Sequence, residues 1–140
     1  MKLLFLLSAL FLSFEPISHA ILNARQLAED SIRHYDLVVT VTDEEAASSG
    51  FRQAIELAHL ALKSGGVNYN SIPARERAKL FVILAYSHYC FARRLAEEVD
   101  RPEHYRQAIK FANQALTITG DSISVGERAG LSEILADNGR

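Results

Sequence analysis

The chain contains an internal repeat, which limits its possible folds more than any other feature of the sequence. Residues 51–62 (FRQAIELAHLAL) and 105–116 (YRQAIKFANQAL) are identical at seven of 12 positions, at an offset of 54 residues. Residues 76–85 and 127–136 are identical at seven of 10 positions, at an offset of 51 residues. Repeats with such a period are typical of folds in which similar supersecondary units stack on one another.

The hydrophobic pattern of each unit is that of a pair of helices, because apolar residues recur at intervals of three and four. We therefore expect an all-α fold of stacked antiparallel helical hairpins, with about five helices after residue 20 and a further helix in residues 1–20. Hairpin 1 should span about 22–64, hairpin 2 about 72–119, and a closing helix about 124–137. Together they would form one domain over residues 21–140.

Two helices are expected in hairpin 1. The first should begin near Asn23, which can act as an N-cap, with Gln26 as its capping-box partner. The second should run from about Gly50 to Lys63, because apolar residues in this range share one helical face. The stretch between them is rich in β-branched residues, which leaves the end of the first helix open.

Hairpin 2 and the closing helix have clearer start signals. The third helix should begin at 71–73, where Pro is tolerated in the first turn, and could run to about Glu98. A capping box at 100–103 should start the fourth helix, and a second box formed by Ser124 and Glu127 should start the closing helix. The closing helix is more polar on one side than the third helix, as expected of a solubilising cap.

The N-terminus has the layout of a secretory signal peptide. Lys2 precedes an apolar run over 3–14, and Ser18-His19-Ala20 supplies small residues before a cleavage point. A helix of 12 apolar residues rises only about 18 Å, less than the thickness of a bilayer core. We therefore expect residues 1–20 to be removed after Ala20. The mature protein would be periplasmic or secreted and would keep no stable membrane anchor.

Composition and motifs argue against several classes of function. The net charge is −2 and no basic stripe is present, so nucleic acid is not an expected partner. The chain has none of the common catalytic or phosphate-binding motifs, and we expect neither enzymatic activity nor a cofactor. His34 and His88 occupy the same repeat position, which favours a shared packing role over a metal site. The single cysteine, Cys90, lies in an apolar stretch and is expected to be a core or groove residue.

The repeated segments resemble the second helix of the tetratricopeptide repeat family, which reads aromatic-x-x-Ala-Ile-x-x-aromatic-x-x-Ala-Leu. The matching residues of the second copy are Tyr105, Ala108, Ile109, Phe111, Ala112, Ala115 and Leu116. The matching residues of the first copy are Phe51, Ala54, Ile55, Leu57, Ala58, Ala61 and Leu62. The period of 51 to 54 departs from the 34 residues of the family. The extra residues fall in 37–50 and 91–104. Armadillo-like or unrelated helical hairpins are the alternatives.

The resemblance implies that the first helix of each hairpin lines a concave groove that binds peptide segments. Transferred position by position, the groove-facing residues are Arg25, Ala28, Ile32, Tyr35, Asp36, Lys79, Val82, Tyr86, Tyr89 and Cys90. Tyrosines beside basic residues are a common mixture at peptide-binding surfaces. The alternative role for Tyr86 and Tyr89 is to fill the junction between neighbouring first helices.

These expectations lead to a function in binding. We expect an exported adaptor or scaffold that binds a peptide or helix of an envelope or secretion-system partner. Dimerisation through a terminal helix would enlarge its short groove. The alternative is a carrier of a small hydrophobic ligand in a pocket between helices. It is suggested by residues 80–86, which are apolar nearly all round.

Overall fold

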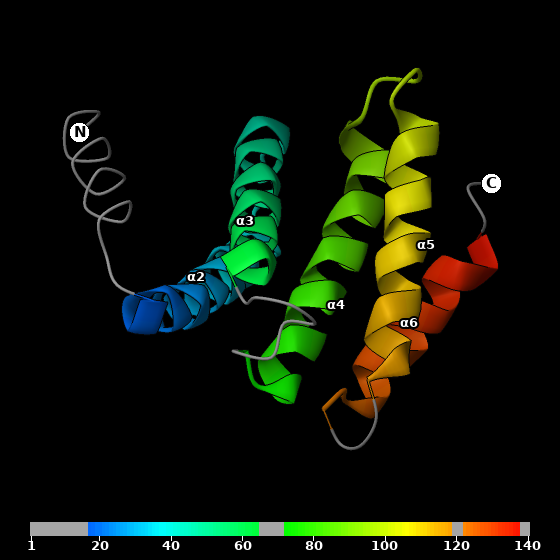
Figure 1. The fold of residues 1–140 in the computed structure, drawn as a ribbon. Coiled ribbons are helices and arrows are strands. Elements are labelled where there is room, and N and C mark those ends of the chain that lie inside the picture. Colours follow the sequence, from blue (N-terminus) through cyan, green and yellow to red (C-terminus); the bar gives the residue numbers. More distant parts are fainter. Residues whose placement is uncertain (1–16, 65–71, 119–121, 138–140) are drawn as a thin grey trace.

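The computed structural model describes residues 17–64, 72–118 and 122–137, and these residues form helices without any strand. The all-α prediction is therefore confirmed. The elements are α2 (Ile17–Val38), α3 (Glu44–Ser64), α4 (Ala74–Cys90), the π-helical turn η2 (Phe91–Leu95), α5 (Arg101–Thr117) and α6 (Val125–Asp137). Helix α2 packs chiefly on α3, and α4 chiefly on α5. Figure 1 shows α4 and α5 side by side and antiparallel.

Small residues line the contacts within the two helix pairs. They are fully buried and are spaced three, four or seven positions apart, so each helix presents one narrow seam. Along α2 and α3 these residues are Ala24, Ala28, Ser31, Ala54, Ala58 and Ala61. Along α4 and α5 they are Ala78, Ala85, Ala108, Ala112 and Ala115. The distance between packed helices depends on the side chains at their contact, so alanine seams permit close packing.

Helix α4 is the central element of the fold. Residues 80–85 are all buried, and α4 contacts α2, α3, α5 and α6. A helix that is apolar on every side has to be covered on every side. The sequence correctly predicted this environment for the third helix.

Helix α3 begins at Glu44, so the predicted start at Gly50 is wrong. Asp43 caps the helix, because its Oδ2 accepts a hydrogen bond from the backbone N of Ala46 at 2.9 Å. Glu44 and Glu45 lie in the first turn, where the helix dipole favours negative charge. Gly50 therefore lies within the helix. A Cβ there would lie 2.5 Å from Cγ2 of Val38 on α2.

Helix α2 begins at Ile17, before the predicted start at Asn23. Asn23 lies inside the helix, so the predicted helix start and N-cap at this position are wrong. The predicted signal peptide lies outside the described residues as far as residue 16, and Ala20 falls in the first turn of α2. Within the described residues, no helix has both the length and the apolar character needed to cross a membrane.

Helix α4 ends at Cys90 and not near Glu98, because the chain changes to a π-helical turn. The backbone N of Ala96 donates to the carbonyl of Phe91 at 2.7 Å, and Ala96 is extended with ψ of 144°. A single turn of this kind inserts an extra residue and redirects the chain. The turn directs Phe91 into the core, where it is 4% exposed.

The two predicted capping boxes of the C-terminal half have different outcomes. Asp100 is at the N-cap of α5 but makes no side-chain capping bond, and Glu103 instead pairs with Arg106 on its own helix. The box before α6 is formed. The backbone N of Glu127 donates to Ser124 Oγ, and the backbone N of Ser124 donates to Glu127 Oε1, both at 3.1 Å.

Candidate functional site

One cavity lies where the first helices of both pairs meet the closing helix, and we call it the Glu76 cavity. Its volume is about 350 Å³. It is lined by Ile32, Arg75, Glu76, Lys79, Ser122, Ser124 and Glu127. The structure therefore brings two of the predicted groove residues, Ile32 and Lys79, into one site. Arg25, a third, adjoins this site through its ion pair with Glu76, at 3.6 Å between Nη2 and Oε1.

A second ion pair fixes the other wall of the Glu76 cavity. Lys79 Nζ lies 3.3 Å from Glu127 Oε2. Burial raises the pKa of Glu127, but the hydrogen bond from the Ser124 backbone and the charge of Lys79 outweigh burial, so its pKa is lowered. Glu127 is therefore ionised at neutral pH and held in place by α4.

Glu76 has an unsatisfied atom. Its Oε2 is buried and has no hydrogen-bond partner in the part of the chain that the structure describes. Buried carboxylate oxygens are nearly always hydrogen-bonded, because losing hydration without a replacement is costly. Glu76, a lining residue of the cavity, therefore has an acceptor that lacks its donor.

Two of the predicted groove residues are part of the core, so their placement in a groove is wrong. Ala28 is fully buried and Val82 is 1% exposed. Val82 shares one helical face with Ala78 and Ala85, at spacings of four and three, and this face forms the seam with α5. Of the remaining residues, Asp36 is exposed near the end of α2.

Tyr86 and Tyr89 connect α4 to α6. This placement agrees with their alternative role, which is to fill the junction between neighbouring first helices. Tyr86 Oη donates to the backbone carbonyl of Glu127 at 3.0 Å, and Tyr89 Oη donates to the carboxylate of Asp137. The tyrosine ring of Tyr86 occupies the space over Gly130, where a Cβ would collide with its hydroxyl. These tyrosines hold the closing helix, and both are half-buried.

Tyr35 and Cys90 belong to a second, smaller core cluster, at the end of the molecule where η2 lies. Tyr35 packs against Phe51 with ring centroids 6.2 Å apart, and Phe51 packs against Phe91 at 6.2 Å. Burial raises the pKa of the Cys90 thiol, outweighing the nearby Arg94. A thiol of this kind is a weak nucleophile, which agrees with a packing role.

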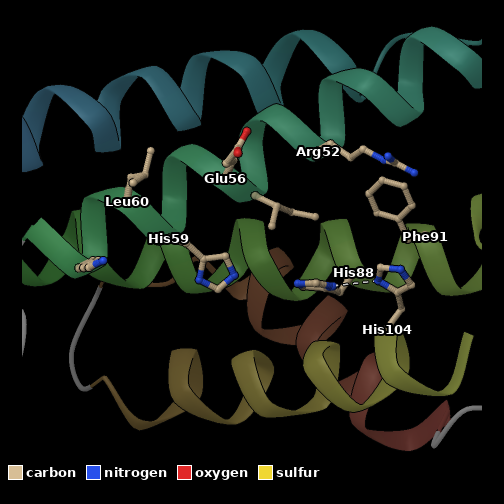
Figure 2. A pocket seen from close by; sticks show the side chains of 9 residues that line it. Arg52, Glu56, His59, Leu60, His88, Phe91 and His104 are labelled. Atoms are coloured by element: carbon tan, nitrogen blue, oxygen red, sulfur yellow. Dashed lines mark hydrogen bonds between the residues drawn. The ribbon is translucent and has the colours of Figure 1, made fainter. Parts of the chain in front are cut away.

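A larger cavity of about 590 Å³ lies between α3 and α5, with the end of α4 and the start of η2 at its floor. We call it the histidine cavity. It is lined by Arg52, Ile55, Glu56, His59, Leu60, Lys63, His88, Phe91 and His104. Figure 2 shows His59, His88 and His104 arranged in a row from three different helices. The sequence prediction singled out only one of these rings.

The histidine rings contact one another and the aromatic core. His88 Nδ1 lies 3.1 Å from His104 Nδ1, so one ring donates and the other accepts. His88 also stacks on Phe111, and His59 meets Phe111 edge-on, with centroids 5.9 and 5.5 Å away. Burial, followed by the charges of His104 and His59, lowers the pKa of His88 to about 4. These rings are therefore neutral partners at neutral pH.

The arrangement is not that of a metal centre. Among the described residues, no group of three or more His, Cys, Asp or Glu side chains is placed to hold a metal ion. Searches against protein-family models, curated proteins and solved structures give no match to the chain. Its function therefore has to be inferred from the two cavities themselves.

Proposed function

We propose that the chain is an exported adaptor that holds a segment of a partner protein in the Glu76 cavity. The observation that carries this proposal is the buried, unpaired Glu76 Oε2 in the wall of a cavity built from α2, α4 and α6. An unpaired buried acceptor costs about 1–3 kcal/mol, and more when it is charged. A backbone N–H or a basic side chain of a bound peptide would supply the missing donor.

The other groups of the Glu76 cavity also suit a peptide. Arg75 and Lys79 oppose the two glutamates, so the lining is neutral overall, and Ile32 adds an apolar wall. A peptide offers donors, acceptors and apolar groups together, which matches this mixture. The tetratricopeptide-like arrangement of helix pairs, with first helices lining the binding side, is part of the same proposal.

The proposed setting is the periplasm or the extracellular space, because the N-terminus reads as a signal peptide. Mass spectrometry of the protein isolated from its own cells tests this part. We expect a mature chain that begins at Ile21. A full-length chain with an intact N-terminus in the cytosol would contradict export and leave peptide binding to be tested separately.

The binding site can be tested by site-specific photo-crosslinking in the native host. A crosslinking amino acid at Ile32 should capture a defined partner, whereas the same group at Leu60, which lies in the histidine cavity, should not. Capture of the same proteins from both positions would contradict the assignment of the Glu76 cavity.

Affinity then gives the sharper test. With the crosslinked segment made as a labelled peptide, Glu76→Gln should raise Kd by roughly tenfold, because one oxygen acceptor becomes a donor. Glu56→Gln on α3 is the matched control and should leave Kd unchanged. Equal affinity of the Glu76→Gln variant and the unmodified protein would overturn the proposal.

A second candidate function, carriage of a small ligand, is favoured by a different observation. The volume of the histidine cavity lies within the roughly 300–1,000 Å³ of small-molecule sites. Residues 80–86, which suggested such a carrier at first, contribute nothing to this cavity, because 80–85 lie in the core.

A further inference from the structure

The histidine cavity has an apolar body. Ile55 and Leu60 from α3 and Phe91 from η2 line it, and Leu60 is 46% exposed although it is a large apolar side chain. Apolar surface left open to water is favourable to cover, and an aliphatic or aromatic group of a ligand would do so.

A buried nitrogen in the same cavity lacks a partner. The single proton between His88 Nδ1 and His104 Nδ1 fixes the tautomer of each neutral ring. In either tautomer, His88 Nε2 is a polar atom, and it is buried without a hydrogen bond among the described residues. If His104 donates, His88 Nε2 carries a hydrogen that needs an acceptor.

Charged groups of both signs surround the histidine cavity. Lys110 Nζ lies 5.2 Å from the centroid of Phe111, the ring on which His88 stacks and which His59 meets. Arg52 and Lys63 line the cavity, and Glu56 is the one acidic residue in its lining. Glu103 also faces His88 from α5. Asp100 and Glu103 also act on His104, so the cationic and anionic groups balance, and the hydrogen on His88 Nε2 is what favours an anionic acceptor.

We propose that the histidine cavity binds a small amphipathic carboxylate. Its carboxylate accepts a hydrogen bond from His88 Nε2, and its apolar body covers Ile55 and Leu60. This inference rests on the second candidate function, which it deepens by naming the ligand class. It is independent of the adaptor proposal, because the Glu76 cavity shares no residue with the histidine cavity.

Isothermal titration of the purified protein with three probes of equal chain length tests the inference. The probes are decanoate, 1-decanol and decyltrimethylammonium, each below its micelle concentration. Decanoate should bind with a Kd roughly tenfold lower than that of decanol, because a charged hydrogen bond is added to the same apolar contact. The cationic probe should bind weakest.

Two variants locate the carboxylate. His88→Leu replaces the ring and its nitrogens by an apolar side chain and should abolish the preference for decanoate over decanol. Lys110→Gln changes an exposed residue and should therefore fold even if His88→Leu does not. It should reduce the preference for decanoate over decanol severalfold. His34→Leu is the matched control, because His34 holds the same repeat position outside the cavity, and it should leave binding unchanged.

Two outcomes would overturn the inference in different ways. Equal binding of decanoate and decanol would leave ligand carriage standing but would remove the carboxylate. No binding of any probe to the folded protein would remove both the inference and the second candidate function. Nitrogen-15 spectra of the histidine rings give an independent readout, since decanoate should shift the His88 Nε2 resonance.

Discussion

Helices α3 and α5 carry the two copies of the repeated segment, and their seams are buried alike. The alanines at the three repeated positions of both helices are fully buried. The first aromatic residue of each copy contacts a tyrosine of the preceding helix. The Tyr35–Phe51 centroids lie 6.2 Å apart, and the equivalent Tyr89–Tyr105 centroids lie 6.0 Å apart. The duplicated sequence thus produces duplicated packing.

The copies differ where the second one meets the histidine cavity. Leu57 of α3 is half-buried, whereas its counterpart Phe111 is 4% exposed and packs against His59 and His88. Gly50 corresponds to His104 at the same offset of 54 residues. The repeated positions build the scaffold, and the substitutions of Gly50 by His104 and of Leu57 by Phe111 give the second copy the rings that contact His88.

The largest difference between the copies should appear on truncation of Phe111. Phe111→Ala should lower the free energy of unfolding by about 3–5 kcal/mol, because it removes a buried ring with three aromatic neighbours. Leu57→Ala, at the equivalent and more exposed position, should cost about 1–2 kcal/mol. Urea unfolding of both variants measures these losses. Equal losses would mean that the two positions are energetically equivalent and that the contacts of Phe111 with His59 and His88 add no stability.

The next largest effect concerns pH and His88. The folded pKa of about 4 lies below the unfolded value of 6.5, so the unfolded chain binds the proton more readily. The stabilising effect is complete above pH 6.5 and is lost as pH falls toward 4, by about 2–3 kcal/mol. His88→Phe keeps a ring on Phe111 and should reduce this loss, leaving the smaller contributions of His59 and His104, whose pKa values burial also lowers.

Melting temperatures of His88→Phe and the unmodified protein at a series of pH values from 7.5 to 4 check this prediction. The difference between the two proteins at pH 7.5 gives the packing effect alone. If the variant and the unmodified protein lose stability in parallel as the pH falls, protonation of His88 does not cause the loss.

A smaller effect is expected where α2 meets α3. Gly50→Ala should lower the free energy of unfolding by about 1–2 kcal/mol, since the new Cβ would lie 2.5 Å from Val38 Cγ2. The second copy places Ala92 and His104 at these positions, with the small residue on the other helix. Val38→Ala should therefore make Gly50→Ala neutral or stabilising, because alanine is the better helix former. A double-mutant cycle measures this coupling, and additive effects would contradict it.

The sequence predicted the parts of the fold that depend on local periodicity. The seams and the box formed by Ser124 and Glu127 follow from spacings of three and four residues, and all are present. Asp43 and the acidic pair after it were also a readable start signal for α3, although the β-branched residues before them obscured it. The spacing of Val82 from Ala78 and Ala85 likewise indicated that it belongs to the seam. The resemblance to the tetratricopeptide repeat family placed it in the groove instead.

The rest depends on tertiary contacts that the sequence does not reveal. No Gly or Pro marks the π-helical turn after Cys90, and its geometry is coupled to the packing of Phe91 among residues of the second core cluster. His88 and His104 are 16 residues apart and meet only because α4 and α5 run antiparallel. No sequence pattern distinguishes Glu76 from a surface glutamate, because its neighbours in the cavity come from α2 and α6.

The smallest predicted effect tests whether the two seams are interchangeable. Ser31 is fully buried on α2, and its Oγ donates to the carbonyl of Ala54 at 2.8 Å. The equivalent residue on α4 is Ala85, which is also fully buried. Ser31→Ala should cost about 0.5–1.5 kcal/mol, the net value of one hydrogen bond.

The reciprocal change, Ala85→Ser, should cost about as little, because the equivalent carbonyl, that of Ala108, would accept the new hydroxyl group. Chemical denaturation of both variants provides the comparison. If Ala85→Ser loses more than about 2 kcal/mol, its hydroxyl is buried without a partner. The α4–α5 seam would then differ in spacing or register from the α2–α3 seam, and the two helix pairs would share a sequence pattern without sharing a geometry.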